Sequence, residues 1–334
     1  MAALWGLALI WIICGGLVSW ARAGVKLLRG EALAPWQPRR EVPWALLDLL
    51  VVIGANLVAA VLVATALVQL GWRLEATGAA LAPGDLKVQA LANSLIPVLG
   101  MGAGLAFVVF HTGTNARDLG WSREHWVADL KLGLTAFVML APLVFAVQAV
   151  LVQFWESKHP LMEMFKNAPQ DQVLFGLLVL TAVVVAPVFE ELLFRVLLQG
   201  FLERVFAGRW SARELVLGES RRGFRVQGSG LRTEDQIVSE ELIDTEAPIV
   251  AELVEDESAP LRGWAAWLPI AISSLVFALL HWQHGPDWVP LTLLAAGMGY
   301  VYQRTHRILP SLVVHVALNG MSMWGLWVQA GSGF

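Results

Sequence analysis

Residues 182–201 read AVVVAPVFEELLFRVLLQGF, an apolar run typical of a membrane-spanning helix that nevertheless contains Glu190, Glu191 and Arg195. Ionised side chains cost several kcal/mol each in hydrocarbon, so their presence inside a span indicates a functional site. This stretch therefore predicts both a helical membrane protein and a reactive group within it.

The composition of the whole chain supports the membrane prediction. Of its 334 residues 57% are hydrophobic and only 15% are charged, and the mean hydropathy is +0.63. These values exclude a soluble globular protein and indicate a polytopic membrane protein without a nucleic-acid partner. The single cysteine, Cys14, excludes an intrachain disulfide and a cysteine-based metal cluster.

Hydropathy predicts an all-α bundle of about eight transmembrane helices, because that number of apolar stretches can cross about 30 Å of hydrocarbon. They lie near residues 3–21, 44–71, 89–110, 131–154, 172–195, 265–282, 289–303 and 308–330. Lys and Arg are concentrated in alternate loops, which places those loops in the cytoplasm and both termini outside.

The chain divides into three predicted regions. Residues 1–155 hold four N-terminal spans, and residues 172–206 and 264–330 form a catalytic membrane core. Residues 207–263 form a charged cytoplasmic insertion, whose acidic half has too few aromatic residues to build a core. We expect this insertion to be partly disordered and to offer a surface to a protein partner.

The three charged residues of the opening stretch have different expected roles. Glu191 and Arg195 are four residues apart, so they share a helix face and can form an ion pair. Glu190 is displaced by about 100° around the helix and has no partner within it. Glu190 is therefore the expected general base.

Other polar residues in predicted spans complete a candidate site. His315 and Asn319 lie four residues apart in the last span, and His281 ends the sixth span. Together with Glu190 these residues could hydrolyse an amide, the carboxylate taking a proton from water while the other groups stabilise the oxyanion. Alternatively, Glu190, His281 and His315 could be three ligands of a catalytic zinc ion. His111, His125, His159 and His306 fall in predicted loops and receive no role.

The segments EELLFR, FALLH and HVALN, in this order, resemble the CPBP family of intramembrane proteases, which includes the type II CAAX prenyl endopeptidases and the bacterial Abi proteins. The resemblance covers roughly residues 172–207 and 264–323. It implies catalytic roles for Glu190, His281, His315 and Asn319, and supporting roles for Glu191, Arg195 and Phe277. The family resemblance leaves open whether a zinc ion takes part.

The sequence thus predicts an intramembrane endopeptidase that hydrolyses a peptide bond in a membrane-embedded cavity open to the cytoplasmic side. Its expected partners are membrane lipid and a peptide or protein substrate, with lipidation of the substrate left open. Its expected location is the cell membrane if the source is prokaryotic. Two alternatives remain: a catalytically silent family member acting as a scaffold or immunity-type protein, and a transporter.

Overall fold

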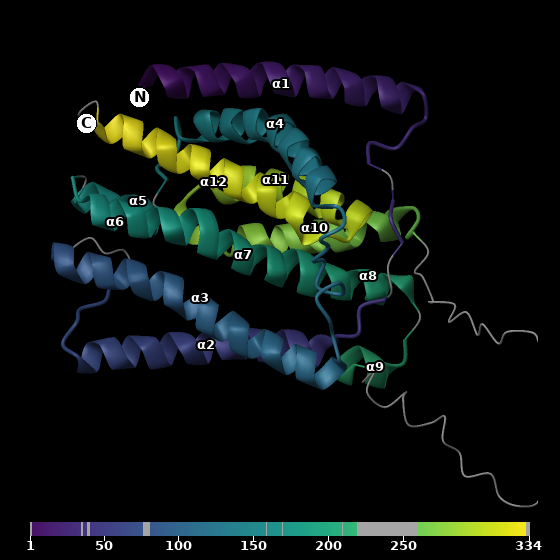
Figure 1. The fold of residues 1–334 in the computed structure, drawn as a ribbon, viewed down its shortest axis with the longest axis horizontal. Coiled ribbons are helices and arrows are strands. Elements are labelled where there is room, and N and C mark those ends of the chain that lie inside the picture. Colours follow the sequence, from purple (N-terminus) through teal and green to yellow (C-terminus); the bar gives the residue numbers. More distant parts are fainter. Residues whose placement is uncertain are drawn as a thin grey trace, which may run out of the picture.

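The structure is a computed structural model that describes residues 2–34, 36–38, 41–75, 81–157, 159–168, 170–208, 210–218 and 260–331. Within these ranges all regular structure is helical, which confirms the predicted all-α class (Figure 1). The helices are α1 (Ala2–Leu28), α2 (Leu46–Gln69), α3 (Pro83–Thr112), α4 (Trp126–Leu151), α5 (Pro160–Asn167), α6 (Gln172–Val179), α7 (Ala186–Glu190), α8 (Gly200–Ala207), α9 (Ala212–Leu217), α10 (Trp264–Leu279), α11 (Trp288–Thr305) and α12 (Ile308–Gly331).

The helices α6, α7 and α8 are parts of one continuous helical rod, because π-helical segments join them at Leu180–Val185 and Glu191–Gln199. Six helices in the described residues are long and apolar enough to cross a membrane: α1, α2, α3, α4, the rod and α12. The other two predicted spans correspond to α10, a shorter apolar helix, and α11, with 18 residues. The chain is a multi-pass integral membrane protein.

Local sequence signals set several helix ends. Pro83 occupies the first turn of α3, where its missing N–H costs nothing, and Gly113 ends that helix with a φ of 73°. Asp171 caps the start of the rod by accepting hydrogen bonds from Val173 N and Leu174 N. Gly208, also with a φ of 73°, ends the rod thirteen residues beyond Arg195. The rod therefore continues well past the predicted span end at residue 195.

The rod runs through the middle of the bundle (Figure 1). The antiparallel pair α2–α3 lies on one side of it, and α12, α4 and α1 lie on the other. Small residues allow close helix contacts: a Cβ added at Gly104 would lie 2.8 Å from Val52 Cα, and one at Gly133 2.7 Å from the Pro310 carbonyl oxygen. These contacts fix α2 against α3 and α4 against α12.

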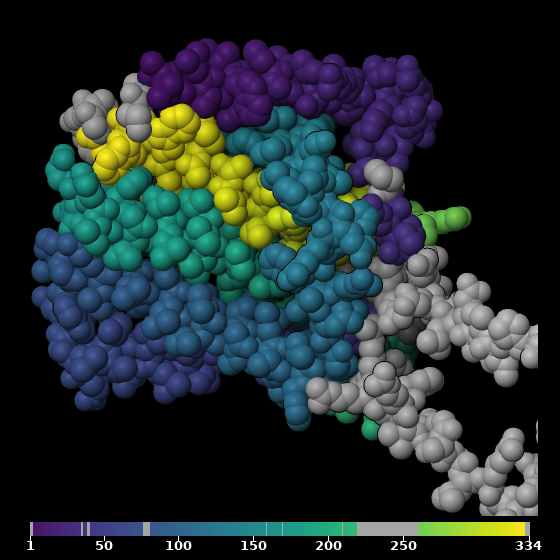
Figure 2. Space-filling view, viewed as in Figure 1, coloured from purple at the N-terminus to yellow at the C-terminus, as the bar shows by residue number. Residues whose placement is uncertain are grey.

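The helix α1 lies along one edge of the molecule, against α4 and α12 (Figure 2). A hydrogen bond from Trp20 Nε1 to the Met139 carbonyl oxygen, 3.0 Å long, ties it to α4. Most of its large apolar side chains are exposed, for example Leu7, Trp11 and Leu17. Such a surface is compatible with contact to lipid tails.

Only the ends of the predicted insertion lie in the described residues. Ser211 and Glu214 form a capping box at the start of the short helix α9. The rest of the insertion, residues 219–259, lies outside the described residues, so its predicted disorder and its role as a partner surface remain predictions. The division of the chain into three regions also remains a prediction.

Candidate active site

Glu190 is the last residue of α7, a five-residue α-helical segment that lies between the two π-helical segments of the rod. Its side chain is 19% exposed, and its Oε2 atom lies 3.3 Å from His315 Nε2. The predicted base therefore has a histidine from α12 as its neighbour. The contact joins two segments 125 residues apart in sequence, as the candidate site requires.

Glu191 and Arg195, which follow Glu190 in the rod, form the predicted ion pair. Arg195 Nε lies 3.4 Å from Glu191 Oε2, and both side chains are fully buried. Glu191 also contacts His315, whose Nδ1 lies 3.0 Å from Glu191 Oε1. His315 is thus held between two carboxylates, one at each ring nitrogen.

This arrangement constrains where protons lie. A neutral imidazole carries one N–H and can donate to only one of the two carboxylates. Both contacts can be hydrogen bonds only if the ring carries two protons or if Glu190 or Glu191 carries one. Glu190, His315 and Glu191 therefore form a continuous path along which a proton can be held or moved.

Phe277 connects the buried ion pair to the histidines. The guanidinium carbon of Arg195 lies 5.4 Å from the centroid of the Phe277 ring, a cation–π distance. The rings of His281 and His315 lie 5.0 and 6.0 Å from the same ring. Phe277 is 1% exposed, so it acts as a packed support for the three groups around it.

His281 follows the end of α10, and its Nδ1 lies 3.0 Å from the Phe277 carbonyl oxygen. Because a carbonyl oxygen only accepts, Nδ1 carries the proton in this contact and Nε2 is left as the other functional atom. Glu190 lies 17 residues before the end of α8, and His281 lies 17 residues after the start of α10. The extension of the rod to Ala207 thus gives both residues a similar depth below the same end of the bundle.

Asn319 lies one helical turn after His315 on α12, and it is partly committed to another partner. Its Nδ2 donates to the Ala182 carbonyl oxygen at 2.8 Å, within the first π-helical segment of the rod. The second Nδ2 hydrogen and the side-chain oxygen are not used in this contact. Asn319 therefore fixes α12 against the rod and retains polar atoms near the cavity described next.

A cavity of about 470 Å³ brings the four predicted catalytic residues to one wall. Glu190, His281, His315 and Asn319 all line it, together with apolar side chains from α4, α11 and α12. A volume of this size is typical of a ligand site. Glu191 and Arg195 lie behind this wall and do not line the cavity.

One end of the cavity is lined by two connections, α4–α5 and α10–α11, which contact each other. Asp287 accepts hydrogen bonds from Gln148 Nε2 at 2.7 Å and from Ser157 Oγ at 2.8 Å. A Cβ on Gly285, whose φ is 89°, would collide with the Glu156 carbonyl oxygen. Glycine is therefore required here for the close approach of the two backbones.

This end of the cavity lies at the end of the bundle away from the Arg-rich loops. Its residues follow the C-terminal ends of α4 and α10, whereas Arg117, Arg204 and Arg304 lie near the opposite helix ends. The opening of the cavity to the cytoplasmic side remains a prediction.

Two histidines at this end of the cavity were not predicted from the sequence. His159 and His284 line the cavity, and their ring centroids lie 4.9 Å apart. Burial first, and then the neighbouring His284 ring, lower the pKa of His159 from 6.5 to about 4. Burial first, and then His281, lower the pKa of His284. Their separation of 125 residues explains why no local pattern links them.

His111 also differs from the prediction, because it lies inside α3 and not in a loop. Its Nδ1 lies 2.8 Å from Oδ1 of Asp48, which is fully buried at the start of α2. This pair ties α2 to α3 and lies apart from the cavity.

The predicted zinc ligands do not fit a metal site in this geometry. In the part of the chain that the structure describes, no three His, Cys, Asp or Glu side chains are arranged as metal ligands. His315 Nε2 is directed at Glu190, and His281 Nδ1 at a backbone carbonyl, so these groups are partners of protein atoms.

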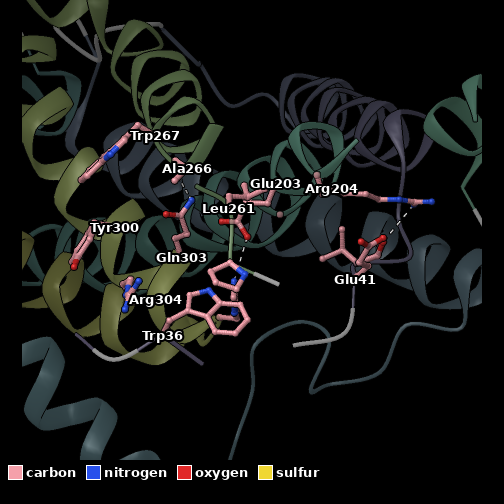
Figure 3. Close-up of a pocket in the computed structure, with 15 residues that line it drawn as sticks. Trp36, Glu41, Glu203, Arg204, Leu261, Ala266, Trp267, Tyr300, Gln303 and Arg304 are labelled. Carbon is pink, nitrogen blue, oxygen red and sulfur yellow. Dashed lines mark hydrogen bonds and ion pairs between the residues drawn. The ribbon is translucent and has the colours of Figure 1, made fainter. Parts of the chain in front are cut away.

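A second cavity, of about 140 Å³, lies at the Arg-rich ends of α8, α10 and α11 (Figure 3). Its polar groups mainly face one another. Glu203 Oε2 lies 3.4 Å from His306 Nε2, Gln303 Nε2 donates to the Ala266 carbonyl oxygen at 2.7 Å, and Arg204 Nη1 faces backbone carbonyls of residues 42–44. This cavity contains no predicted catalytic residue, and its polar contacts connect neighbouring helix ends.

Comparison with known families supports the resemblance. A family model described as type II CAAX prenyl endopeptidase Rce1-like matches residues 249–321. The matched segment includes Phe277, His281, His315 and Asn319, whereas Glu190 lies before it. No curated protein and no solved structure matches the chain.

Proposed function

We propose that this chain, which belongs to the CPBP family of intramembrane proteases, is an endopeptidase with Glu190 as its general base. The observation that carries this proposal is the contact between Glu190 and His315 at the wall of a cavity that His281 and Asn319 also line. The base and the polar donors needed for amide hydrolysis thus come from three separate helical segments.

The proposed reaction begins with a water molecule in the cavity beside Glu190. The carboxylate accepts a proton from the water as the water oxygen attacks the carbonyl carbon of the peptide bond. His281 Nε2, the ring nitrogen without a proton, accepts a hydrogen bond from the water, and Asn319 donates to the oxyanion that forms. One well-placed donor stabilises the oxyanion by about 3–4 kcal/mol. Glu190 then returns its proton to the leaving amine, with His315 orienting the carboxylate.

Glu191 and Arg195 support the site from behind. Their ion pair has no path to the cavity, so neither residue is proposed to contact the substrate. Glu191 fixes the ring of His315 through Nδ1, and Arg195 offsets the charge of Glu191. Because the described residues do not present a three-ligand set, no step is assigned to a metal ion.

The substrate is a peptide or protein that reaches the cavity from the membrane. We also propose, from the family resemblance alone, that lipidated substrates are accepted. We further propose that a protein partner binds the charged insertion, residues 207–263.

A silent family member acting as a scaffold is the main alternative. Purified protein in proteoliposomes, with a mixture of internally quenched peptides that includes a farnesylated-cysteine peptide, separates the two functions. Glu190→Gln and His315→Ala should each lower cleavage by about 10²–10⁴-fold, the usual contribution of a general base. Glu124→Gln, at an exposed site on the Arg-rich face, is the matched control and should cleave normally. Cleavage by Glu190→Gln at the rate of the parent protein would rule out the enzyme proposed here.

A further inference from the structure

We infer that the cavity at the Arg-rich ends of α8, α10 and α11 binds the phosphate group of a membrane phospholipid, with Arg304 as the main contact. This cavity is separate from the proposed catalytic cavity, because no residue lines both. The inference therefore goes beyond the proposed function and can be tested without cleavage.

Arg304 presents hydrogen-bond donors that the protein does not use. Its Nε donates to the Ala34 carbonyl oxygen at 2.8 Å, which fixes the guanidinium near the end of α11. Among the described residues, Nη1 and Nη2 of Arg304 have no hydrogen-bond or ion-pair partner. A guanidinium fixed in this way can donate from two nitrogens to two oxygens of one phosphate group.

Two further donors line the cavity near Arg304. Tyr300 lies one helical turn before Arg304 on α11, and Trp36 comes from the α1–α2 connection. In the view of Figure 3, Arg304 lies between these two side chains. Within the described ranges, neither the Tyr300 hydroxyl nor the Trp36 indole N–H has a hydrogen-bond partner. An indole N–H can only donate and a hydroxyl can donate, so these groups suit an acceptor such as a phosphate oxygen.

The two acidic residues of the cavity face other groups than Arg304. Gln199 Nε2 donates to Glu203 Oε1 at 3.1 Å, and His306 Nε2 lies 3.4 Å from Glu203 Oε2. Figure 3 shows Glu41 on the other side of the cavity from Arg304. The positive charge of Arg304 is thus available to an anion.

The depth of the cavity in the membrane indicates a lipid as the source of the phosphate. With 18 residues, α11 is about 27 Å long at 1.5 Å per residue, close to the hydrocarbon thickness of about 30 Å. Arg304 is the last residue but one of this helix, so its guanidinium lies at the level of the lipid headgroups. Basic pockets between membrane helices bind headgroups at this level.

Exposed aromatic rings beside the cavity support the same source. Trp264 and Trp267, at the start of α10, are 72% and 59% exposed, and indole rings are enriched at the membrane interface. Trp267 stacks on Tyr300 with 6.1 Å between ring centroids, which places an exposed aromatic surface next to the cavity. A volume of about 140 Å³ suits a headgroup, so the acyl chains would lie outside it against these rings.

Native mass spectrometry measures the binding directly. The full chain, purified in detergent and depleted of lipid, is mixed with palmitoyl-oleoyl phosphatidylglycerol or with the diacylglycerol of the same chains, which lacks the phosphate. The parent protein is compared with Arg304→Gln, Trp36→Phe and the control Arg117→Gln. Arg117 lies at the same end of the bundle, in the α3–α4 connection, and its side chain is 83% exposed.

We expect the parent protein to retain phosphatidylglycerol in preference to diacylglycerol. Arg304→Gln should lower the bound fraction of phosphatidylglycerol by about tenfold, because it removes hydrogen bonds from a charged donor. Trp36→Phe removes one neutral donor and should lower it by about threefold. Arg117→Gln should bind as the parent protein does.

Equal binding of phosphatidylglycerol by the parent protein and Arg304→Gln would overturn the site, as would equal binding of the two lipids by the parent protein. Displacement of the lipid by excess inorganic phosphate, but not by chloride at the same ionic strength, would assign the site to a soluble phosphate and overturn the lipid source. None of these results depends on cleavage, so an inactive enzyme and a failed lipid site give different outcomes.

Trp36→Phe keeps the test decisive if Arg304→Gln, which also loses the bond to Ala34, does not fold. Phenylalanine retains an aromatic ring beside His306, whose ring centroid lies 6.0 Å from that of Trp36. A folded Trp36→Phe protein that binds phosphatidylglycerol as tightly as the parent protein would then overturn the assignment.

Discussion

His315 contacts Glu190 through Nε2 at 3.3 Å and Glu191 through Nδ1 at 3.0 Å, so one imidazole ring joins the proposed base to the buried ion pair. The two adjacent glutamates therefore have separate environments. Glu190 faces the cavity, and Glu191 is enclosed between His315 and Arg195. Substitutions at the two positions should have different consequences.

Removing one partner of the buried pair should destabilise the fold. Glu191→Gln leaves the Arg195 guanidinium without its counter-charge in a fully buried position, at a cost of about 3–5 kcal/mol. Thermal unfolding of the detergent-solubilised protein measures the loss. Glu163→Gln, which breaks the exposed pair with Lys166, is the control and should cost about 1 kcal/mol or less.

The double variant Glu191→Gln with Arg195→Met tests whether this loss comes from an uncompensated charge. Removing both charges should cost less than the sum of the two single changes, because no buried ion is left alone. Additive losses would show that the two residues act independently.

Phe277 should contribute to stability through its ring and not only through its volume. Phe277→Leu removes the cation–π contact with Arg195 and the edge contact with Phe194, whose ring centroid lies 5.2 Å away. We expect a loss of about 2 kcal/mol in unfolding free energy, measured by chemical denaturation. Trp282→Leu, at a side chain that is 61% exposed, should leave stability unchanged. An equal loss in both variants would contradict a specific role for the Phe277 ring.

Chelation should leave cleavage intact if Glu190 acts on water without a metal. In the described residues Glu190, His281 and His315 are not arranged as a ligand set. Activity in excess phenanthroline or EDTA should therefore equal activity in buffer. Reversible loss that only added zinc restores would instead favour the zinc mechanism, because a catalytic metal binds in equilibrium with the solvent.

Stability should fall in mild acid because of His159. Its pKa is lowered to about 4 in the folded protein, so the unfolded chain takes up a proton near pH 6.5 while the folded protein does not. The folded state therefore loses stability as the pH falls from about 6.5 to about 4, and this histidine has no such effect above 6.5.

The variant His159→Asn tests this dependence. In the parent protein the Leu161 N–H donates to His159 Nδ1 at 3.3 Å. The side-chain oxygen of asparagine can accept this hydrogen bond, and asparagine is a favourable N-cap residue. Melting temperatures at pH 7.5 and pH 5 should differ less in the variant than in the parent protein. An unchanged difference would assign the acid sensitivity to other groups.

Hydropathy was sufficient to predict the helices, because each long apolar run must satisfy its backbone hydrogen bonds internally in lipid. The motif residues were also placed correctly relative to one another: Glu190 and His315 meet, and Glu191 pairs with Arg195. Their catalytic roles remain predictions. These contacts could be predicted from the sequence because each motif has a fixed spacing on its own helix.

Two features could not be predicted from the sequence. The rod continues to Ala207, twelve residues beyond the span end predicted at residue 195, and hydropathy alone does not fix the residue at which a helix ends. His159 and His284 come together only through the folding of two connections.

The two π-helical segments lie immediately before and after the short segment that holds Glu190. A π-helical turn is widened by i→i+5 hydrogen bonds and is usually equivalent to one residue inserted into an α-helix. The azimuth of the Glu190 carboxylate is therefore set by these insertions as well as by its position in the motif. A homologue with regular α-helix in either place would need a one-residue gap in an alignment to keep its acidic group in phase with the α12 imidazole.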